Sequence, residues 1–591
     1  MKDIKTNFIR NNSLLYIFTA VVVSVIIIFS INTIYAEEND KKPLDLWENN
    51  SLLSKDEDKK KELNSVSTNN IINSEEEIDQ SKINVSNLDS IGIYDESNGG
   101  FSIGVWKNSN FDQIEYLLNK VPPDSRNTVL KNLINKSLLT ISNPPVQKNK
   151  NEKIFFDLKI EYLEKAANYN EIEKLFSLIP EDDLNDDLLK KYITSKLING
   201  DYKSICRLDS QISEGKFKLE INSFCKAMSN NLPALDLMIS LLIEEDIADK
   251  DLLYIYYSYI NQTEIDLKRI KNLDIKKINL ISNLGIDFSE YIDENSPLEL
   301  QLFFIYSKLK AEDKKVVLAE NLLSTSTLES SVLGDLYKQY FTGSNLNTSV
   351  DYLNMDSSMK KRVGIYNLIR STSDQSKLPK LLSLYVDEMG SQKLLLNSAN
   401  LVYDKAKIIT PKQSYKNDVL PICVILLINN DIEKCKEWLD ALTFDKESKE
   451  IIKKIKFYLF LKNDDDQIKS SVLNNAENYV SLESLDDIDK NIIAKFFSLR
   501  QENQFLEFWR SKNDMIRTSG ITINIKLIEY LNQIKDISVG EAILLSSIIY
   551  GNNNEHSKDV YALFSIIKTL EVINPSFTDE FLFEYFANNL I

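Results

Sequence analysis

Residues 155–166 read FFDLKIEYLEKA, and this stretch decides the fold. Its apolar residues recur every three or four positions, the spacing that places side chains on one side of a helix. They are Phe155, Leu158, Tyr162, Leu163 and Ala166. Residues 188–197 repeat the pattern with Leu188, Leu189, Tyr192, Ile193 and Leu197. The sequence therefore predicts a body of amphipathic helices.

Short polar breaks separate the amphipathic runs from residue 151 to the end. Glycine (14) and proline (12) are scarce, which favours helices joined by short turns. Several breaks are about 30 residues apart, the length of a helix–turn–helix repeat. They fall at Asn168–Asn170, Asn199–Asp201, Ser229–Asn231, Asn261–Thr263, Ala311–Asp313, Thr342–Ser344, Thr372–Asp374, Asn429–Asp431, Asn463–Asp464, Gln501–Asn503 and Gly551–Asn554.

This spacing predicts an all-α fold in which residues 146–591 form a helical-repeat array. We expect a tetratricopeptide-like solenoid of antiparallel helix pairs, which presents a long concave face. The repeat register drifts after Thr263, and the small-residue consensus of tetratricopeptide repeats is absent. The likeness is therefore one of architecture only.

The N-terminus carries an uncharged apolar segment, Leu14–Ala36, with basic residues before it and acidic residues after it. This order places the start of the chain in the cytoplasm and predicts export of the rest to the periplasm. Residues 1–36 are either a signal peptide cleaved after Ala36 or a retained anchor, with residues 14–36 tethering the protein to the inner membrane.

Two further segments precede the repeat array. Residues 37–90 are polar and poor in aromatic residues, and they predict a disordered acidic linker. Residues 91–145 predict a small N-terminal module. Alternating apolar residues in Ile91–Trp106 indicate a hairpin or an extended strap, and helices are expected at Phe111–Leu118 and Thr128–Leu139.

The N-terminal module also carries a family resemblance. Its signals are Tyr94-Asp95, Asn98-Gly99-Gly100, Val105-Trp106, Leu117-Leu118 and Val121-Pro122. In these residues the module resembles a family of exported alphaproteobacterial proteins that has no assigned activity. The resemblance implies an envelope location and an all-helical body, and it supplies no catalytic residues.

Composition and motifs exclude several classes of function. A net charge of −18 repels nucleic acid, and no basic run with interleaved aromatic residues occurs. Gly100-Phe101-Ser102-Ile103-Gly104 matches a hydrolase nucleophile motif, but no strand–helix alternation surrounds it. The single histidine, His556, lies in an Asn-rich turn. We expect no catalytic residues, no metal site and no cofactor.

The four cysteines predict two disulfides in an exported chain. Cys423 and Cys435 lie at equal distances from Asn429, and Cys206 and Cys225 lie almost equally far from Gly215. Positions equidistant from a turn lie side by side in a helix pair, so both pairs could reach bridging distance. We expect structural bridges rather than a redox switch.

Tyr254, Tyr256, Tyr257 and Tyr259 form the densest aromatic cluster. Tyr254 and Tyr257 share one side of the predicted helix, and Tyr256 and Tyr259 share another. Tyr254 and Tyr257 are the candidate groove residues for a peptide or a glycan. Packing between helices is the simpler interpretation of the cluster.

Two functions remain open from the sequence. The first is an exported, non-catalytic scaffold that binds protein partners in the cell envelope through its concave face, with peptidoglycan as a further candidate ligand. The alternative is a cell-wall glycan-processing enzyme, or its accessory subunit, related in shape to the superhelix of lytic transglycosylases. No segment resembling their catalytic domain is recognisable near either end. Membrane contact is expected only through an uncleaved N-terminal segment.

Overall fold

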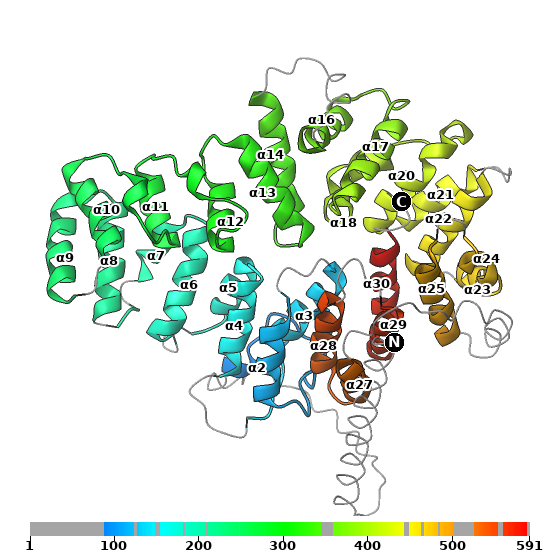
Figure 1. Cartoon of the computed structure of the whole chain (residues 1–591), viewed down its shortest axis with the longest axis horizontal. Coiled ribbons are helices and arrows are strands. Elements are labelled where there is room, and N and C mark those ends of the chain that lie inside the picture. Colours follow the sequence, from blue (N-terminus) through cyan, green and yellow to red (C-terminus); the bar gives the residue numbers. More distant parts are fainter. Residues whose placement is uncertain are drawn as a thin grey trace, which may run out of the picture. The chain divides into compact units, whose positions relative to one another are not determined.

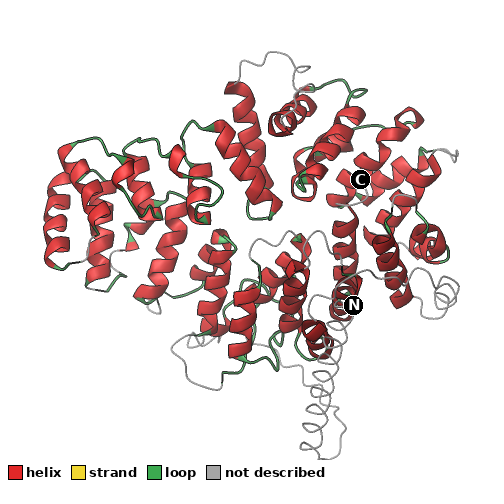
Figure 2. Ribbon diagram, in the orientation of Figure 1, coloured by secondary structure: helices red, strands yellow, loops and turns green. Residues whose placement is uncertain are grey.

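The structure is a computed structural model, and its described part of the chain is helical (Figures 1 and 2). It describes residues 88–122, 127–147, 154–180, 184–208, 211–213, 215–246, 249–343, 358–442, 448–462, 466–482, 485–500, 525–552 and 559–587. These residues contain no strand and only two isolated bridges, Tyr94–Thr140 and Asn110–Val146. The all-α prediction is confirmed.

The N-terminal half contains α2 (Phe111–Lys120), α3 (Thr128–Leu139), α4 (Phe155–Lys165), α5 (Tyr169–Phe176), α6 (Asp186–Ile198), α7 (Tyr202–Ile205), α8 (Lys216–Met228), α9 (Leu232–Glu244), α10 (Lys250–Asn261), α11 (Ile275–Asn283) and α12 (Leu298–Tyr306). Then follow α13 (Glu312–Ser324), α14 (Ser330–Gly343), α16 (Ser358–Ser371), α17 (Leu378–Ser391), α18 (Leu395–Ser398), α19 (Tyr403–Lys407), α20 (Val419–Ile428), α21 (Ile432–Asp440), α22 (Ser448–Lys462), α23 (Asp466–Leu473), α24 (Ala476–Val480), α25 (Asp487–Arg500), α27 (Ile525–Ile534), α28 (Val539–Asn552), α29 (Val560–Ile573) and α30 (Pro575–Ala587).

The same three-residue turn occurs four times, at the predicted breaks Asn199–Asp201, Ser229–Asn231 and Asn429–Asp431 and at residues 166–168, which share only Asn168 with the predicted break Asn168–Asn170. Its middle residue has a positive φ of 54° to 68°, and Gly200 fills this position without the steric cost that other residues meet there. The next residue is the N-cap of the following helix, and its N–H donates to a carbonyl five residues earlier, a Schellman closure. These bonds are Asn168–Leu163 (2.8 Å), Asp201–Lys196 (3.0 Å), Asn231–Lys226 (2.9 Å) and Asp431–Leu426 (2.9 Å).

The buried core follows the apolar pattern of each helix. Most helices bury one side, whereas α20 is apolar throughout and buries residues from Val419 to Leu427 with little interruption. A helix that is apolar all round must be covered on all sides, and α20 contacts α17, α19, α21 and α22.

The N-terminal module contains an extended strap, not a hairpin. The N–H groups of Ile93 and Tyr94 donate to the Leu139 carbonyl (2.6 and 3.0 Å), and the Ile141 N–H donates to the Tyr94 carbonyl (2.8 Å). The strap therefore pairs with the residues that follow α3. The buried Lys159 side chain of α4 donates to the Ile91 carbonyl (2.7 Å) and fixes the start of the strap.

The same module packs on the last helices of the chain, so that α2 and α3 contact α28 and α3 contacts α30 (Figure 1). The Gly540 N–H donates to the Val105 carbonyl (2.9 Å), and the hydroxyls of Ser109 and Ser538 share a hydrogen bond of 2.6 Å. Trp106, which is 1% exposed, lies where a side chain of Gly540 would project. This close approach requires glycine at position 540.

A buried carboxylate completes the contact between α30 and α3. Glu584 accepts hydrogen bonds from the first N–H groups of α3, those of Thr128 (2.6 Å) and Val129 (2.9 Å). A carboxylate at a helix N-terminus satisfies free donors and complements the helix dipole. Burial raises the pKa of Glu584 to about 7, although these two hydrogen bonds and Lys462 favour the charged form.

Some predictions concern residues outside the described part. These are the membrane or signal segment at 1–36, the linker up to residue 87, and His556. In the described ranges, no helix has both the length and the apolar character needed to cross a bilayer.

The contact between Trp106 and Gly540 can be tested with two glycine variants. Gly540→Ala would place its Cβ 2.5 Å from the buried indole, so we expect a loss of about 1–3 kcal/mol in the free energy of unfolding. Gly390→Ala in α17 is the control, because a Cβ there meets nothing within 4 Å. We expect it to gain up to about 1 kcal/mol. Equal stability of the two variants in urea unfolding would contradict this packing.

Candidate functional site

The main candidate site is a cavity of about 550 Å³ beside α3, called here the α3 cavity. Its walls come from segments that are far apart in the sequence: the strap residue Tyr94, one side of α3, the α4–α5 turn, the end of α6, the end of α12, the α13–α14 loop and the start of α30. The cavity therefore depends on the contact between the N-terminal module and the last helices.

Asparagine amides form much of the polar surface of the α3 cavity. The lining asparagines are Asn132, Asn135, Asn168, Asn170 and Asn199. Asn168 donates to the Asn135 side chain (3.0 Å), and Asn199 donates to the Glu173 carboxylate (2.9 Å). Amides both donate and accept hydrogen bonds, so this surface suits a polar ligand.

Aromatic rings and charged groups complete the lining. The rings are those of Tyr94, Tyr169, Tyr306 and Phe577, and the charged groups are Lys136, Glu171, Glu329 and Glu580. The Lys136 ammonium lies 5.9 Å from the centre of the Phe577 ring.

Two phenols of the cavity wall, Tyr169 and Tyr306, have raised pKa values. Burial raises the pKa of Tyr169, and the carboxylates of Glu299 and Glu164 raise it further. Burial also raises the pKa of Tyr306, with a contribution from Glu329. Burial is the main cause of both shifts, and nearby carboxylates add to it.

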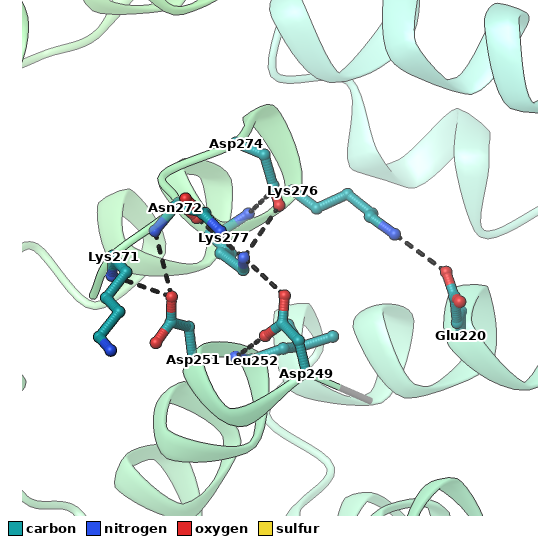
Figure 3. Close-up of polar contacts among 9 residues, drawn as sticks. All are labelled: Glu220, Asp249, Asp251, Leu252, Lys271, Asn272, Asp274, Lys276 and Lys277. Carbon is teal, nitrogen blue, oxygen red and sulfur yellow. Dashed lines mark hydrogen bonds and ion pairs between the residues drawn. The ribbon is translucent and has the colours of Figure 1, made fainter. Parts of the chain in front are cut away.

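A second polar cluster joins α10 to α11 through one buried ammonium (Figure 3). Lys277, 3% exposed, contacts the carboxylates of Asp249 (2.7 Å) and Asp274 (3.2 Å) and donates to the Asn272 carbonyl (2.8 Å). The two aspartates are the N-caps of α10 and α11. One lysine therefore fixes the starts of both helices, and the ion pairs raise the pKa of Lys277 despite its burial.

The loop before α11 is held by another carboxylate of α10. Asp251 accepts from the backbone N–H groups of Lys271 (2.9 Å) and Asn272 (3.2 Å), as Figure 3 shows. Lys276 pairs with Glu220 of α8 (2.9 Å). The charged groups of this cluster bind one another or nearby backbone groups, so we interpret the cluster as structural.

The four tyrosines of α10 fall into two pairs that differ in burial, as the helical spacing suggests. Tyr256 and Tyr259 are buried in the core. Tyr254 is partly buried, and its hydroxyl accepts from the Asp266 N–H (2.9 Å), whereas Tyr257 is exposed. Neither candidate groove residue, Tyr254 or Tyr257, lines the α3 cavity. Their role in ligand binding stays a prediction.

The cysteines follow the prediction in one pair only. Cys206 and Cys225 form a disulfide with a Cα–Cα distance of 5.7 Å. Cys423 and Cys435 are buried thiols, so the bridge expected there is absent from the structure. The Cys423 thiol donates to the Cys435 carbonyl (3.8 Å) and also interacts with the Cys435 thiol, so symmetry about the turn brings the two residues together although no bridge joins them.

The sequence did not reveal the α3 cavity. Asn168–Asn170 and Asn199 were recognised only as parts of turns, and nothing in their local pattern connects them with α3 or α30. In the described part of the chain, no group of histidine, cysteine, aspartate and glutamate side chains could hold a metal ion.

Comparisons with protein families, curated proteins and solved structures found no match for this chain.

The buried ammonium of Lys277 gives a direct stability prediction. Lys277→Met should lower the free energy of unfolding by about 1–3 kcal/mol, because it leaves the Asn272 carbonyl and two carboxylates without their partner. Lys276→Met removes an adjacent charge from a more exposed ion pair and should cost less than about 1 kcal/mol. Urea unfolding of both variants would measure this. Equal losses would rule out a special role for Lys277.

The cysteine assignment predicts the number of free thiols. The protein purified without reductant and unfolded in denaturant should show two reactive thiols per chain, those of Cys423 and Cys435. Prior reduction should raise the number to four. Cys423→Ser/Cys435→Ser is the control and should show none before reduction. Four thiols before reduction, or none in the natural chain, would refute the assignment.

Proposed function

We propose that this chain is an exported helical-repeat protein that scaffolds components of the cell envelope without catalysis. In this proposal, residues 146–591 form a tetratricopeptide-like solenoid of antiparallel helix pairs. The single observation that carries it is the recurrence of one turn conformation, with the same left-handed residue, N-cap and Schellman bond, at four places along the chain.

Contacts between consecutive helices support the repeat architecture. All four turns join helices that contact each other: α4 with α5, α6 with α7, α8 with α9, and α20 with α21. Two helices joined by a turn of only three residues typically form an antiparallel helical hairpin. Stacked pairs of this kind bury a continuous core and leave a long surface for partners.

Localisation in the periplasm rests on the sequence of the first 36 residues. The protein would be soluble there after cleavage at Ala36, or held at the inner membrane by residues 14–36. The proposed partners are envelope proteins, with peptidoglycan as an additional ligand, and the negative net charge disfavours nucleic acid.

Crosslinking in living cells tests this function. The tagged full-length protein is crosslinked and captured, and co-purified proteins are identified by mass spectrometry. We expect one or a few envelope proteins in near-equal amount. Tyr257→Ala should reduce their recovery if the groove residues of α10 take part. Tyr291→Ala is the matched control, because both tyrosines are 41% exposed.

Two outcomes would contradict the scaffold. Capture of no partner protein would remove its basis. Release of soluble muropeptides from purified cell walls by the pure protein would instead favour the glycan-processing enzyme.

A further inference from the structure

We propose that the α3 cavity binds a small linear polyamine, a flexible ligand with several protonated amines along its length. The inference concerns a small-molecule site and does not rest on the scaffold function. It stands on the size of the cavity, on two lining carboxylates without an ion pair, Glu329 and Glu580, and on the finding that the described acidic residues form no group that could hold a metal.

The size of the cavity fits a small organic ligand. Its volume of about 550 Å³ lies within the usual range for small-molecule sites, roughly 300–1,000 Å³. Its walls are tied together by hydrogen bonds that do not involve a ligand. Thr128 and Ser326 share one of 3.0 Å, and Lys131 donates to the Thr325 carbonyl (2.8 Å). The cavity is therefore pre-formed.

The charges of the lining select a cation. Three carboxylates and one ammonium line the cavity. The Lys136 ammonium lies near the Phe577 ring. Glu171 already pairs with Lys174 of its own helix (3.7 Å), which leaves Glu329 and Glu580. Within the described ranges neither Glu329 nor Glu580 has a cation at ion-pair distance, although the Ser331 hydroxyl donates to Glu329 (3.4 Å) and the charge of Lys462 acts on Glu580 from α22. An anionic ligand would meet uncompensated repulsion, whereas protonated amines would neutralise both groups.

Unused hydrogen-bonding groups and aromatic faces add to the site. The amides of Asn132 and Asn170 make no hydrogen bond within the part of the chain that the structure describes. Amines can donate to the side-chain oxygens of both. Tyr306, which is 46% exposed, and Tyr94 offer ring faces that attract organic cations.

The spacing of the carboxylates distinguishes a polyamine from a metal ion. They come from α5, the α13–α14 loop and α30, and they do not converge into any cluster that could coordinate a metal among the described residues. Separate carboxylates match separate amines on a chain. A compact monoamine would neutralise only one of them.

Calorimetric titration with spermidine tests the proposal on the full-length protein. We expect saturable binding of one ligand per chain. Glu329→Gln/Glu580→Gln should weaken it at least about tenfold, because each change removes a charge-assisted hydrogen bond. The control is Asp187→Asn/Glu433→Gln, which removes two negative charges from side chains that are 87% and 82% exposed. The control should bind as the natural chain does.

A second variant separates binding in the cavity from general attraction to an acidic protein. Asn132→Trp fills the cavity from an exposed position of α3 without a change of charge, and it should abolish binding. Absence of spermidine binding, equal weakening in the two double variants, or full binding by Asn132→Trp would each overturn the proposal. If Asn132→Trp fails to fold, the comparison of the double variants decides. Binding of N-acetylglucosamine in place of spermidine would assign the cavity to a neutral saccharide and overturn it too.

Discussion

One residue with a positive φ governs each of the four matching turns. Its left-handed conformation closes the preceding helix through a Schellman hydrogen bond and delivers the next residue as an N-cap. Ala167 accepts this conformation although glycine or asparagine suits it better, which shows that packing on both sides imposes it. The lengths and starts of the neighbouring helices follow from this constraint.

The turns fix only neighbouring helices, whereas the packing of the N-terminal module on the last helices joins distant parts of the chain and forms part of the α3 cavity. Trp106 against Gly540 and Glu584 against the first turn of α3 join the two regions. The helix α3 also lines the α3 cavity, where Phe577 and Glu580 of α30 form part of the wall. The contact between α3 and α30 therefore stabilises the packing of the N-terminal module and also shapes the cavity.

The sequence predicted local features far better than distant ones. The expected helix at Thr128–Leu139 matches α3 residue for residue, and the Asn and Asp residues of the breaks are N-caps, because both features depend on neighbours along the chain. The α3 cavity requires segments far apart in the sequence, and no periodicity encodes their meeting. Spacing about a turn also predicted that Cys423 and Cys435 meet, but it does not specify whether two neighbouring thiols are joined, and in the structure they are free thiols.

The contact between the N-terminal module and the last helices can form only late in synthesis of the chain. Ser109 and Ser538, which share a hydrogen bond, are 429 residues apart, so ribosomes need on the order of half a minute to make the second after the first. During that time the indole of Trp106 lacks its contact with Gly540, and the first turn of α3 lacks the Glu584 carboxylate. A chain cut short before α28 would leave these surfaces bare at its opposite end. Damage near the C-terminus would thus expose the N-terminal module to aggregation or proteolysis.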